Sequence, residues 1–355
     1  MFELRNPLEN LYQIGDKINK MMKKPRTIGK SRVISIGNIS TGGTGKTPMT
    51  QWLASLLKNS GYKVAILTRG YGGTIYKTGG LLSDGKEVYL SEIESGDEPY
   101  LLAVNLPGVP VAVGRDRHAN GVMLSEKFDI DFFILDDGFQ HYALQRALDI
   151  VLIDATRPFG NGHIIPLGNL REEPTALARS GIIVITKSDL ISPEELQALR
   201  EKLSGYAGHN RIYSSMHSPK ALVKAPADYS TGERPDWRFE RLAMLKNQEV
   251  WALSGIGNHR AFEETLRRLG ASEVKGISFR DHHRYNEKDI DSILKRVSRQ
   301  DIVVTTEKDW IRLRYFREKL QVLKKFYFMP IELTFVPGEL DQIREDLRVS
   351  LQIEV

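Results

Sequence analysis

Short apolar runs alternate with helical patterns over the first two thirds of the chain. The runs cover residues 33–36, 64–67, 109–113, 132–135, 150–153 and 182–185. Such alternation is typical of βαβ units, in which helices cover both faces of a mostly parallel sheet. We therefore predict an α/β domain with a mostly parallel sheet over residues 29–215. The glycine-rich loop described below makes this domain one of P-loop NTPase type.

A second set of runs follows a segment with little periodicity. Residues 216–247 contain three prolines, and we expect a linker there. Beyond it, strand patterns cover residues 250–253, 277–279, 302–305 and 326–335, and helical patterns cover residues 259–269 and 289–297. The pattern predicts a second, smaller α/β domain over residues 248–355, with ligands in the cleft between the domains and at the carboxyl ends of strands.

Residues 1–28 form the remaining predicted element, an amphipathic helix. Its apolar residues at helical spacing are Leu8, Leu11, Tyr12, Ile18 and Met22, and lysines occupy other faces. Residues 1–32 hold eight Lys/Arg and three Asp/Glu, so the other 42 basic and 42 acidic residues cancel. A terminal helix packed on its own domain is one interpretation. We favour a helix lying in a membrane interface on anionic headgroups.

The composition is that of a soluble globular protein, with 41% hydrophobic and 27% charged residues. The absence of cysteine excludes disulfides and thiolate metal sites. No apolar run approaches the roughly 20 residues of a membrane span, and we expect neither a signal peptide nor a transmembrane segment. The expected location is cytoplasmic and peripheral to the membrane.

A glycine-rich loop follows the first apolar run and leads into a helical pattern. Its residues are Thr41, Gly42, Gly43, Thr44, Gly45, Lys46 and Thr47, followed by Pro48. This is the Walker A order, although Ser40 stands where the usual spacing has glycine. Backbone N–H groups would wrap the phosphates of a nucleotide, Lys46 would neutralise them, and Thr47 would bind Mg²⁺. A structural glycine loop would not require Lys-Thr at its end.

Two further segments bear on the nucleotide chemistry. Asp136 and Asp137 follow an apolar run and suit a second metal ligand, although they also fit a solvated strand end; the pattern leaves open which of them binds the metal. Residues 186–189, Thr-Lys-Ser-Asp, resemble the guanine-reading motif of GTPases. A GTP-binding regulator or metallochaperone therefore stays an alternative, as does a kinase of a water-soluble sugar or cofactor.

A set of motifs carries a more specific resemblance. In chain order they are residues 36–38, 42–48, Arg69-Gly70-Tyr71-Gly72, Gly96-Asp97-Glu98-Pro99, Arg115-Asp116-Arg117, residues 135–141, residues 166–172 and Phe279-Arg280-Asp281-His282-His283. Their combination resembles the tetraacyldisaccharide 4'-kinase family over nearly the entire chain, and Ser40 agrees with the loop variant of that family.

The resemblance implies a reaction and a place in the cell. The γ-phosphate of ATP, used with Mg²⁺, would pass to the 4'-hydroxyl of a tetraacylated glucosamine disaccharide 1-phosphate in lipid A biosynthesis. The enzyme would act at the cytoplasmic face of a Gram-negative inner membrane, where residues 1–28 hold it against its lipid substrate. We expect neither nucleic acid nor an obligate protein partner.

The resemblance also implies site residues. The catalytic pair would be Asp97 and His282, brought together by closure of the cleft; the structural alternatives are a helix N-cap for Asp97 and a surface or capping histidine for His282. Glu98 joins the candidate metal ligands Thr47, Asp136 and Asp137. The candidate substrate-binding residues are Arg69, Tyr71, Arg115, Arg171 and Glu172.

Overall fold

The computed structural model describes residues 9, 15, 20–225 and 238–355. It contains two compact units. The first comprises residues 1–85, 89–217 and 333–355, and the second comprises residues 86–88 and 218–332. Most of the helix expected over residues 1–28 lies outside the described residues, although residues 20–22 are helical. Residues 226–237 of the expected linker also lie outside them.

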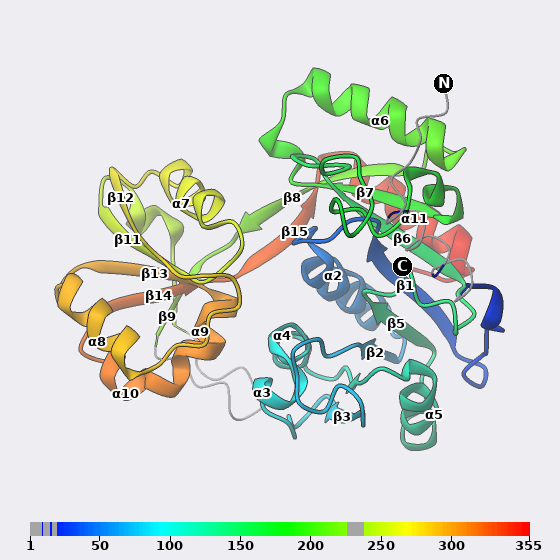
Figure 1. Ribbon diagram of the computed structural model, residues 1–355, viewed down its shortest axis with the longest axis horizontal. Helices are drawn as coiled ribbons and strands as arrows, with labels where there is room; N and C mark the ends of the chain where they lie inside the picture. Colours follow the sequence, from blue (N-terminus) through cyan, green and yellow to red (C-terminus); the bar gives the residue numbers. More distant parts are fainter. Residues whose placement is uncertain (1–8, 10–14, 16–19, 226–237) are drawn as a thin grey trace. The chain divides into compact units, whose positions relative to one another are not determined.

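The first unit is built on a mostly parallel sheet. Among the described residues its nine strands are β1 (Arg32–Asn38), β2 (Val64–Thr68), β3 (Gly80–Ser83), β4 (Val111–Val113), β5 (Phe132–Asp136), β6 (Leu148–Asp154), β7 (Ile182–Thr186), β8 (Ile212–Pro219) and β15 (Ile331–Phe335). Their spatial order is β15-β8-β7-β6-β1-β5-β2-β4-β3 (Figure 1). The strands from β8 to β4 in this order pair in parallel, and β3 pairs antiparallel to β4.

Helices cover both faces of this sheet. They are α2 (Lys46–Asn59), α3 (Glu92–Ser95), α4 (Asp97–Asn105), α5 (Arg117–Lys127), α6 (Pro193–Ala207) and α11 (Glu339–Leu351), with 3-10 turns η1 (Pro174–Arg179) and η2 (Ser188–Leu190). Leu124 of α5 packs with Leu135 of β5, whereas Thr50 of α2 contacts the next residue, Asp136. Since successive strand residues point to opposite faces, α5 and α2 lie on opposite sides of the sheet. The expected α/β architecture is confirmed.

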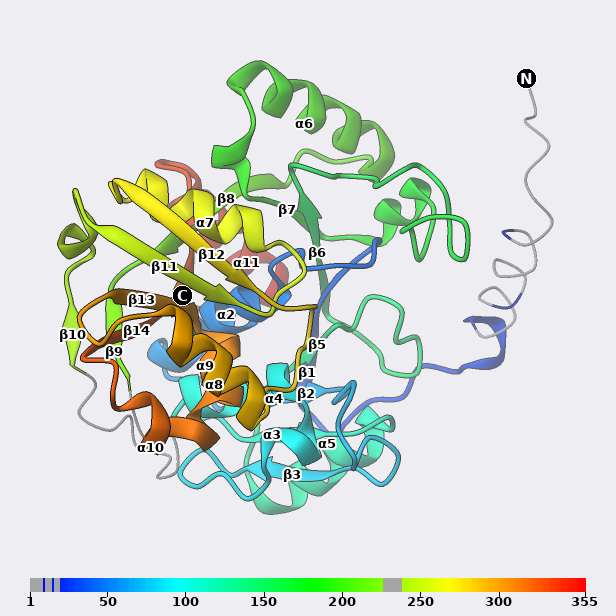
Figure 2. The same cartoon turned by 60° about the vertical axis from the view of Figure 1, so that its left-hand side comes forward.

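The core beside β7 shows how α6 is held. Helix α6 lies beside β7 in both views (Figures 1 and 2). Leu199 and Leu203 of α6 join a buried cluster with Ile183 and Ile185 of β7. Burial of such aliphatic side chains stabilises the fold by about 1.5–3 kcal/mol each. The carboxyl end of β7 is therefore a fixed position from which the residues that follow it are presented.

The second unit has its own smaller sheet. Among the described residues its strands are β9 (Leu222–Lys224), β10 (Phe239–Glu240), β11 (Glu249–Ser254), β12 (Glu273–Ser278), β13 (Ile302–Thr306) and β14 (Lys325–Met329), in the order β10-β9-β14-β13-β11-β12. Its helices are α7 (His259–Arg268), α8 (Glu287–Arg296), α9 (Glu307–Leu313) and α10 (Arg317–Leu320), with 3-10 turns η3 (Leu242–Leu245) and η4 (Arg314–Phe316). Strands β12, β11, β13 and β14 are parallel.

The structure differs from the expected domain limits in two places. Strands β9 and β10 and turn η3 lie within the expected linker, because Leu222 and Val223 are fully buried in runs too short to show periodicity. The single strand expected over residues 326–335 is two strands in different sheets, separated by Pro330. Proline has no N–H to continue a ladder. Residues 333–355 consequently return to the first unit.

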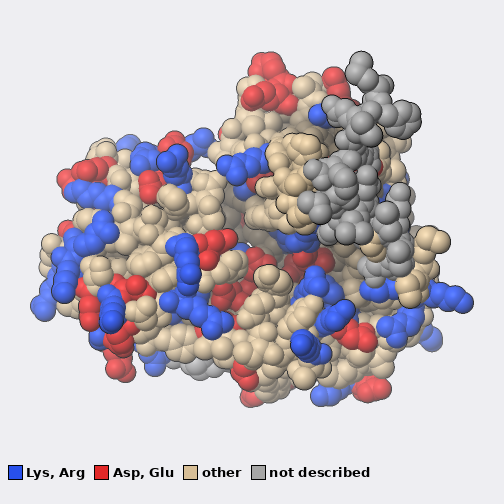
Figure 3. Space-filling view, in the orientation of Figure 1, with Lys and Arg blue, Asp and Glu red and all other residues tan. Residues whose placement is uncertain are grey.

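Charge is mixed over the described surface. On the face shown in Figure 3, Lys and Arg side chains lie among Asp and Glu side chains in each unit. This agrees with the balanced charge of the chain beyond residue 32. Among the described residues, no helix is both long and apolar enough to cross a bilayer.

Candidate active site

The loop after β1 has the geometry of a phosphate loop. Gly42 and Gly45 have φ values of 114° and 87°, which favour glycine. Asn38 Nδ2 donates a hydrogen bond to Thr44 Oγ1 at 2.8 Å. Helix α2 begins at Lys46, so the unpaired N–H groups of its first turn open onto the loop. The strand–loop–helix order expected from the sequence is present.

This loop is tied to the segment that carries Arg171. The backbone N–H of Thr41 donates to Asn169 O at 2.7 Å, and Ser40 pairs with Leu170 in an isolated bridge. The backbone N–H of Arg171 donates to Ile39 O at 2.7 Å. Arg171 is therefore held beside the base of the phosphate loop.

Asp136 ends β5 beside the phosphate loop and is almost fully buried. It lies opposite Ile36 in the register between β5 and β1. Its carboxylate accepts hydrogen bonds from Thr50 Oγ1 at 3.3 Å and Thr68 Oγ1 at 3.2 Å. Burial, followed by the negative charges of Glu98 and Asp137, raises the pKa of Asp136 to about 6. Neither threonine belongs to the motifs from which the site was predicted.

Asp137 is engaged by two cations. Its backbone is left-handed, with φ of 55°. Arg171 Nη1 lies 2.8 and 2.9 Å from its two oxygens, and Lys46 Nζ lies 3.7 Å from Oδ1. Burial would raise the pKa of Asp137, but the charges of Lys46 and Arg171 outweigh it and hold this pKa below its usual value. Asp137 is thus an anion at neutral pH.

The acidic side chains around Lys46 fit a divalent cation that is bound together with a nucleotide. Burial, and then the negative charges of Glu98 and Asp137, keep the pKa of Asp136 raised although the charge of Lys46 lowers it. Within the described parts of the chain, no three His, Asp or Glu side chains form a complete metal-binding set. Mg²⁺ commonly takes one or two carboxylates, with phosphate oxygens and water completing its shell. The residues present match that mode.

The segment that carries Arg69 and Tyr71 packs on the turn before Asp97. A Cβ added to Gly96 would lie 2.9 Å from Tyr71 O, and one added to Gly73 would lie 2.4 Å from Glu94 O. Helix α4 begins at Asp97 with Gly96 as its N-cap, so the N-cap interpretation of Asp97 is wrong. The backbone that follows Arg69 therefore lies against the turn from which Asp97 begins α4.

The arginines of this region differ in burial. Arg115 is exposed, and Arg69 is exposed with its Nη2 2.8 Å from Tyr76 Oη. Arg117 is buried, and its Nη1 lies 3.3 Å from His141 Nδ1. Burial, followed by the charge of Arg69, lowers the pKa of Arg117 to about 10, while Asp137 and Asp136 oppose this effect. Arg117 therefore remains a buried cation near the two aspartates.

Glu172 lies in a hydrogen-bonded cluster under the Arg171 segment. Its carboxylate accepts from Gln140 Nε2 at 2.8 Å and Tyr142 Oη at 3.0 Å, and pairs with Arg179 Nη1 at 2.8 Å. Only 7% of Glu172 is exposed. These contacts fix the buried Glu172 carboxylate among Gln140, Tyr142 and Arg179.

The two adjacent histidines of the second unit have different environments. His283 Nε2 lies 2.9 Å from Asp289 Oδ2, and its ring stacks on Phe279 at 4.6 Å. The His282 side chain is 58% exposed, and its backbone φ is 54°. A left-handed conformation is uncommon outside glycine, and such strain concentrates at functional positions. His283 is packed into the unit, whereas His282 is presented to solvent.

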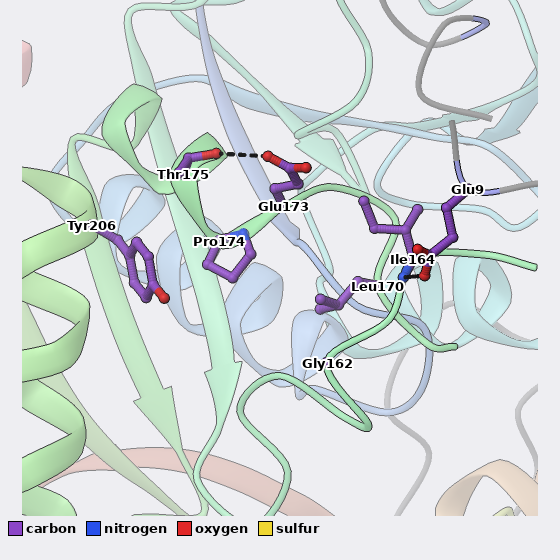
Figure 4. Close-up of a pocket in the computed structure, with 8 residues that line it drawn as sticks. All are labelled: Glu9, Gly162, Ile164, Leu170, Glu173, Pro174, Thr175 and Tyr206. Atoms are coloured by element: carbon purple, nitrogen blue, oxygen red, sulfur yellow. Dashed lines mark hydrogen bonds between the residues drawn. The ribbon is translucent and has the colours of Figure 1, made fainter. Parts of the chain in front are cut away.

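A cavity of about 250 Å³ lies in the first unit beside Glu9. Glu9, Gly162, Ile164, Leu170, Glu173, Pro174, Thr175 and Tyr206 line it (Figure 4). The Glu9 carboxylate accepts from the Ile164 N–H at 3.0 Å and lies 3.1 Å from His163 Nδ1. Glu9 is thus bonded to the loop that leads to Arg171.

Comparisons with known proteins agree on one family. The family model described as tetraacyldisaccharide-1-P 4'-kinase matches residues 4–350. The tetraacyldisaccharide 4'-kinase of Syntrophus aciditrophicus (strain SB) is 40% identical over 314 residues, which are 86% of this chain and 81% of that protein. The tetraacyldisaccharide 4'-kinase of Desulfatibacillum aliphaticivorans is 39% identical over 284 residues, which are 79% of this chain and 74% of that protein.

A solved structure is similar over the same extent. The crystal structure of LpxK from Aquifex aeolicus in complex with ATP superposes with a TM-score of 0.74, at 27% identity and over 97% of each chain. The resemblance inferred from the motifs is confirmed, and the alternative of a GTP-binding regulator or metallochaperone is not favoured. This chain belongs to the tetraacyldisaccharide 4'-kinase family.

Proposed function

We propose that the chain transfers the γ-phosphate of ATP to the 4'-hydroxyl of a tetraacylated glucosamine disaccharide 1-phosphate in lipid A biosynthesis. The observation that carries the proposal is a phosphate loop flanked by Asp136, Asp137 and Arg171 in a chain that matches the kinase family over residues 4–350. The test is transfer of radiolabel from γ-labelled ATP to the detergent-solubilised lipid. Hydrolysis of GTP without transfer from ATP would exclude the kinase.

In this reaction the residues of the site have distinct tasks. Lys46 and the loop N–H groups hold the β- and γ-phosphates, while Asp97 accepts the proton of the attacking hydroxyl. The new bond joins the 4'-oxygen to the γ-phosphorus, and ADP leaves with the electrons of the broken bond. We assign His282 as the partner of Asp97 because it is the exposed member of its histidine pair. Arg69, Tyr71 and Arg115 are assigned to the acceptor.

Thr47 and Asp136 would hold Mg²⁺, with Glu98 nearby. Asp136 is chosen over Asp137 because Asp137 already pairs with Lys46 and Arg171, whereas the pKa of Asp136 is raised by burial and by neighbouring acids. Bound Mg²⁺ would neutralise charge on the transferred phosphoryl group.

The Mg²⁺ concentration that gives half-maximal activity is expected to rise about tenfold per pH unit below pH 6. The folded pKa of Asp136 is raised, so below about pH 6 a proton occupies the carboxylate and Mg²⁺ must displace it. Mg²⁺ titrations at pH 5, 6, 7 and 8 measure the effect. Asp136→Asn is the control, because residual pH dependence in it belongs to ATP itself. Identical slopes in both proteins would contradict the assignment.

We also propose that the N-terminal segment binds the cytoplasmic face of the inner membrane. Met21 and Met22 are 86% and 79% exposed, and Lys20, Lys23 and Lys24 adjoin them in the sequence. Exposed apolar side chains beside lysines suit an anionic headgroup region. Glu9, in the same stretch of sequence, bonds to the loop before Arg171.

Replacing Met21 and Met22 by serine is expected to release the protein from vesicles that contain anionic lipid. Activity on the lipid in vesicles should fall several-fold, because the substrate remains in the bilayer. Activity on dispersed lipid in detergent should change much less. Val349→Ser is the matched control, since Val349 is 55% exposed on α11. Sedimentation with vesicles measures binding, and equal retention of both variants would refute the proposal.

A further inference from the structure

The backbone of His282 is held by the loop that follows β11. The His282 N–H donates to Gly255 O at 3.2 Å and to Asp281 Oδ1 at 3.0 Å. Asp281 is exposed, so water competes for its bond, whereas Gly255 is buried. The His282 backbone is left-handed, with φ of 54°, a conformation that residues other than glycine seldom adopt without support. The Gly255 carbonyl is therefore the protected support of this conformation.

The N–H of Gly255 is bonded in turn to Asp309 of α9. It donates to Asp309 Oδ2 at 3.0 Å. A Cβ added to Gly255 would lie 3.0 Å from Asp309 Oδ1 and 3.1 Å from Tyr285 Oη, so a side chain has little room there. One residue, Gly255, thus connects the Asp309 carboxylate with the backbone of His282.

Asp309 is fully buried, and three further groups surround its carboxylate. Tyr285 Oη donates to Oδ1 at 3.0 Å, Thr306 Oγ1 donates to Oδ2 at 2.6 Å, and Arg312 Nη2 lies 3.7 Å from Oδ1. A buried carboxylate is strongly destabilising without such partners, so these contacts are held firmly. Thr306 Oγ1 also accepts from the Asp309 N–H at 3.1 Å and caps α9. This cap uses the backbone of Asp309 and does not account for its carboxylate.

The same cluster fixes the chain after His282. Arg312 Nη1 donates to His283 O at 2.9 Å, and the His283 ring lies edge-to-face with the Tyr285 ring at 5.1 Å between centroids. The main chain is therefore held on both sides of the His282 Cα atom, while the His282 side chain is exposed. The second unit fixes the backbone of this segment and leaves the imidazole at its surface.

We propose that Asp309 is a positioning residue for His282. Through Gly255 it keeps the His282 backbone in the left-handed conformation, and this conformation sets the direction in which the imidazole leaves the second unit. The inference rests on the proposed function, in which His282 is the partner of Asp97.

Loss of the Asp309 charge is expected to slow phosphate transfer only where His282 is present. Asp309→Asn should lower kcat by about ten- to a hundredfold with little change in KM for ATP, because a displaced imidazole affects the chemical step and not nucleotide binding. In a His282→Gly background, Asp309→Asn should cause no further loss. A further loss of the same size in that background would overturn the proposal, because the effect would then not pass through His282.

Asp301→Asn is the matched control for stability. Asp301 lies in the same unit and accepts from Trp251 Nε1 at 3.0 Å and from the Ser298 N–H at 2.9 Å. Asp301→Asn and Asp309→Asn should both lower the melting temperature, because each weakens hydrogen bonds of the folded unit. Only Asp309→Asn should lower kcat, and an equal loss of kcat in Asp301→Asn would indicate a general effect of stability.

Tyr285→Phe is a milder variant of the same cluster. It removes one hydrogen bond from the Asp309 carboxylate and keeps the aromatic packing. It should lower kcat several-fold, again only where His282 is present, and it tests the proposal even if Asp309→Asn does not fold. Wild-type kcat in Tyr285→Phe together with an unfolded or fully active Asp309→Asn would contradict the proposal.

A measurement on the backbone separates this inference from the proposed function. The Cα and Cβ chemical shifts of His282 report its φ in the full-length protein without substrate. They should move away from left-handed values in Asp309→Asn and stay unchanged in Asp301→Asn, and unchanged shifts in Asp309→Asn would overturn the proposal. If the shifts move as expected but the wild type transfers no phosphate to the lipid, the proposed function is wrong, whereas the hold of Asp309 on His282 stands.

Discussion

Asp97→Asn is expected to lower kcat by about 10²- to 10⁴-fold while nucleotide affinity stays close to that of the wild type. Asparagine keeps the shape of the side chain but cannot accept the proton of the attacking hydroxyl. The fold should tolerate the change because Gly96, not Asp97, caps α4. Single-turnover transfer and separate nucleotide binding measure the two effects. Near-wild-type turnover would remove Asp97 from the base role.

The adjacent histidines supply the matched control for the partner of Asp97. His282→Gly should reduce kcat strongly with little change in melting temperature, since glycine adopts φ of 54° without strain. His283→Ala should lower the melting temperature, because it removes the contacts with Phe279 and Asp289. If Asp97 and His282 act as a unit, the double variant will be little slower than Asp97→Asn alone. If the loss of kcat in the double variant equals the product of the two single losses, Asp97 and His282 have independent roles.

Lys46→Ala is expected to have the second large effect, a loss of about 10²- to 10³-fold in kcat together with weaker ATP binding. Lys46 is 11% exposed and lies 3.7 Å from Asp137, so its removal also leaves uncompensated negative charge where phosphates bind. Asp137→Asn should therefore restore part of the ATP affinity of Lys46→Ala. Calorimetry and transfer rates measure both quantities.

Lys58→Ala is the control for this variant. Lys58 lies in the last turn of the same helix, where its ammonium binds Pro107 O at the surface. The Lys58→Ala variant should therefore keep the kcat of the wild type. If Lys46→Ala retained full activity, or if Asp137→Asn worsened its ATP binding, the phosphate-binding role of Lys46 would be wrong.

The periodic patterns predicted the strands of the first unit well, because each of these strands is a short apolar run that can be seen in the local sequence. The runs at residues 132–135 and 182–185 are strands β5 and β7, and in the second unit the helix over residues 259–269 is α7. The division of residues 326–335 between two sheets was not predictable from periodicity, because both halves are apolar and only Pro330 separates them. Strand partners depend on tertiary contacts that local pattern does not contain.

The candidate site was predictable at its glycines, Lys46 and its acids, because phosphate binding demands those residue types in order. The contacts that surround these residues were not predicted. Thr50 lies one helical turn after Lys46, and Thr68 ends an apolar run. The spacing of each threonine in the sequence is therefore a signal from which its contact with Asp136 could have been predicted. Contact of His217 with Gly45 joins residues 172 positions apart, and no local pattern encodes it.

The insertion of residues 218–332 between β8 and β15 has a consequence for synthesis. Strand β15 covers the edge of the large sheet at β8, and α11 is bonded to β8 where Tyr213 Oη donates to Asp346 Oδ2 at 2.6 Å. A ribosome completes both elements only after the whole second unit has emerged. Until then β8 is an open sheet edge, the kind of surface on which nascent chains aggregate. The half of the molecule that holds the phosphate loop is largely made first and finished last.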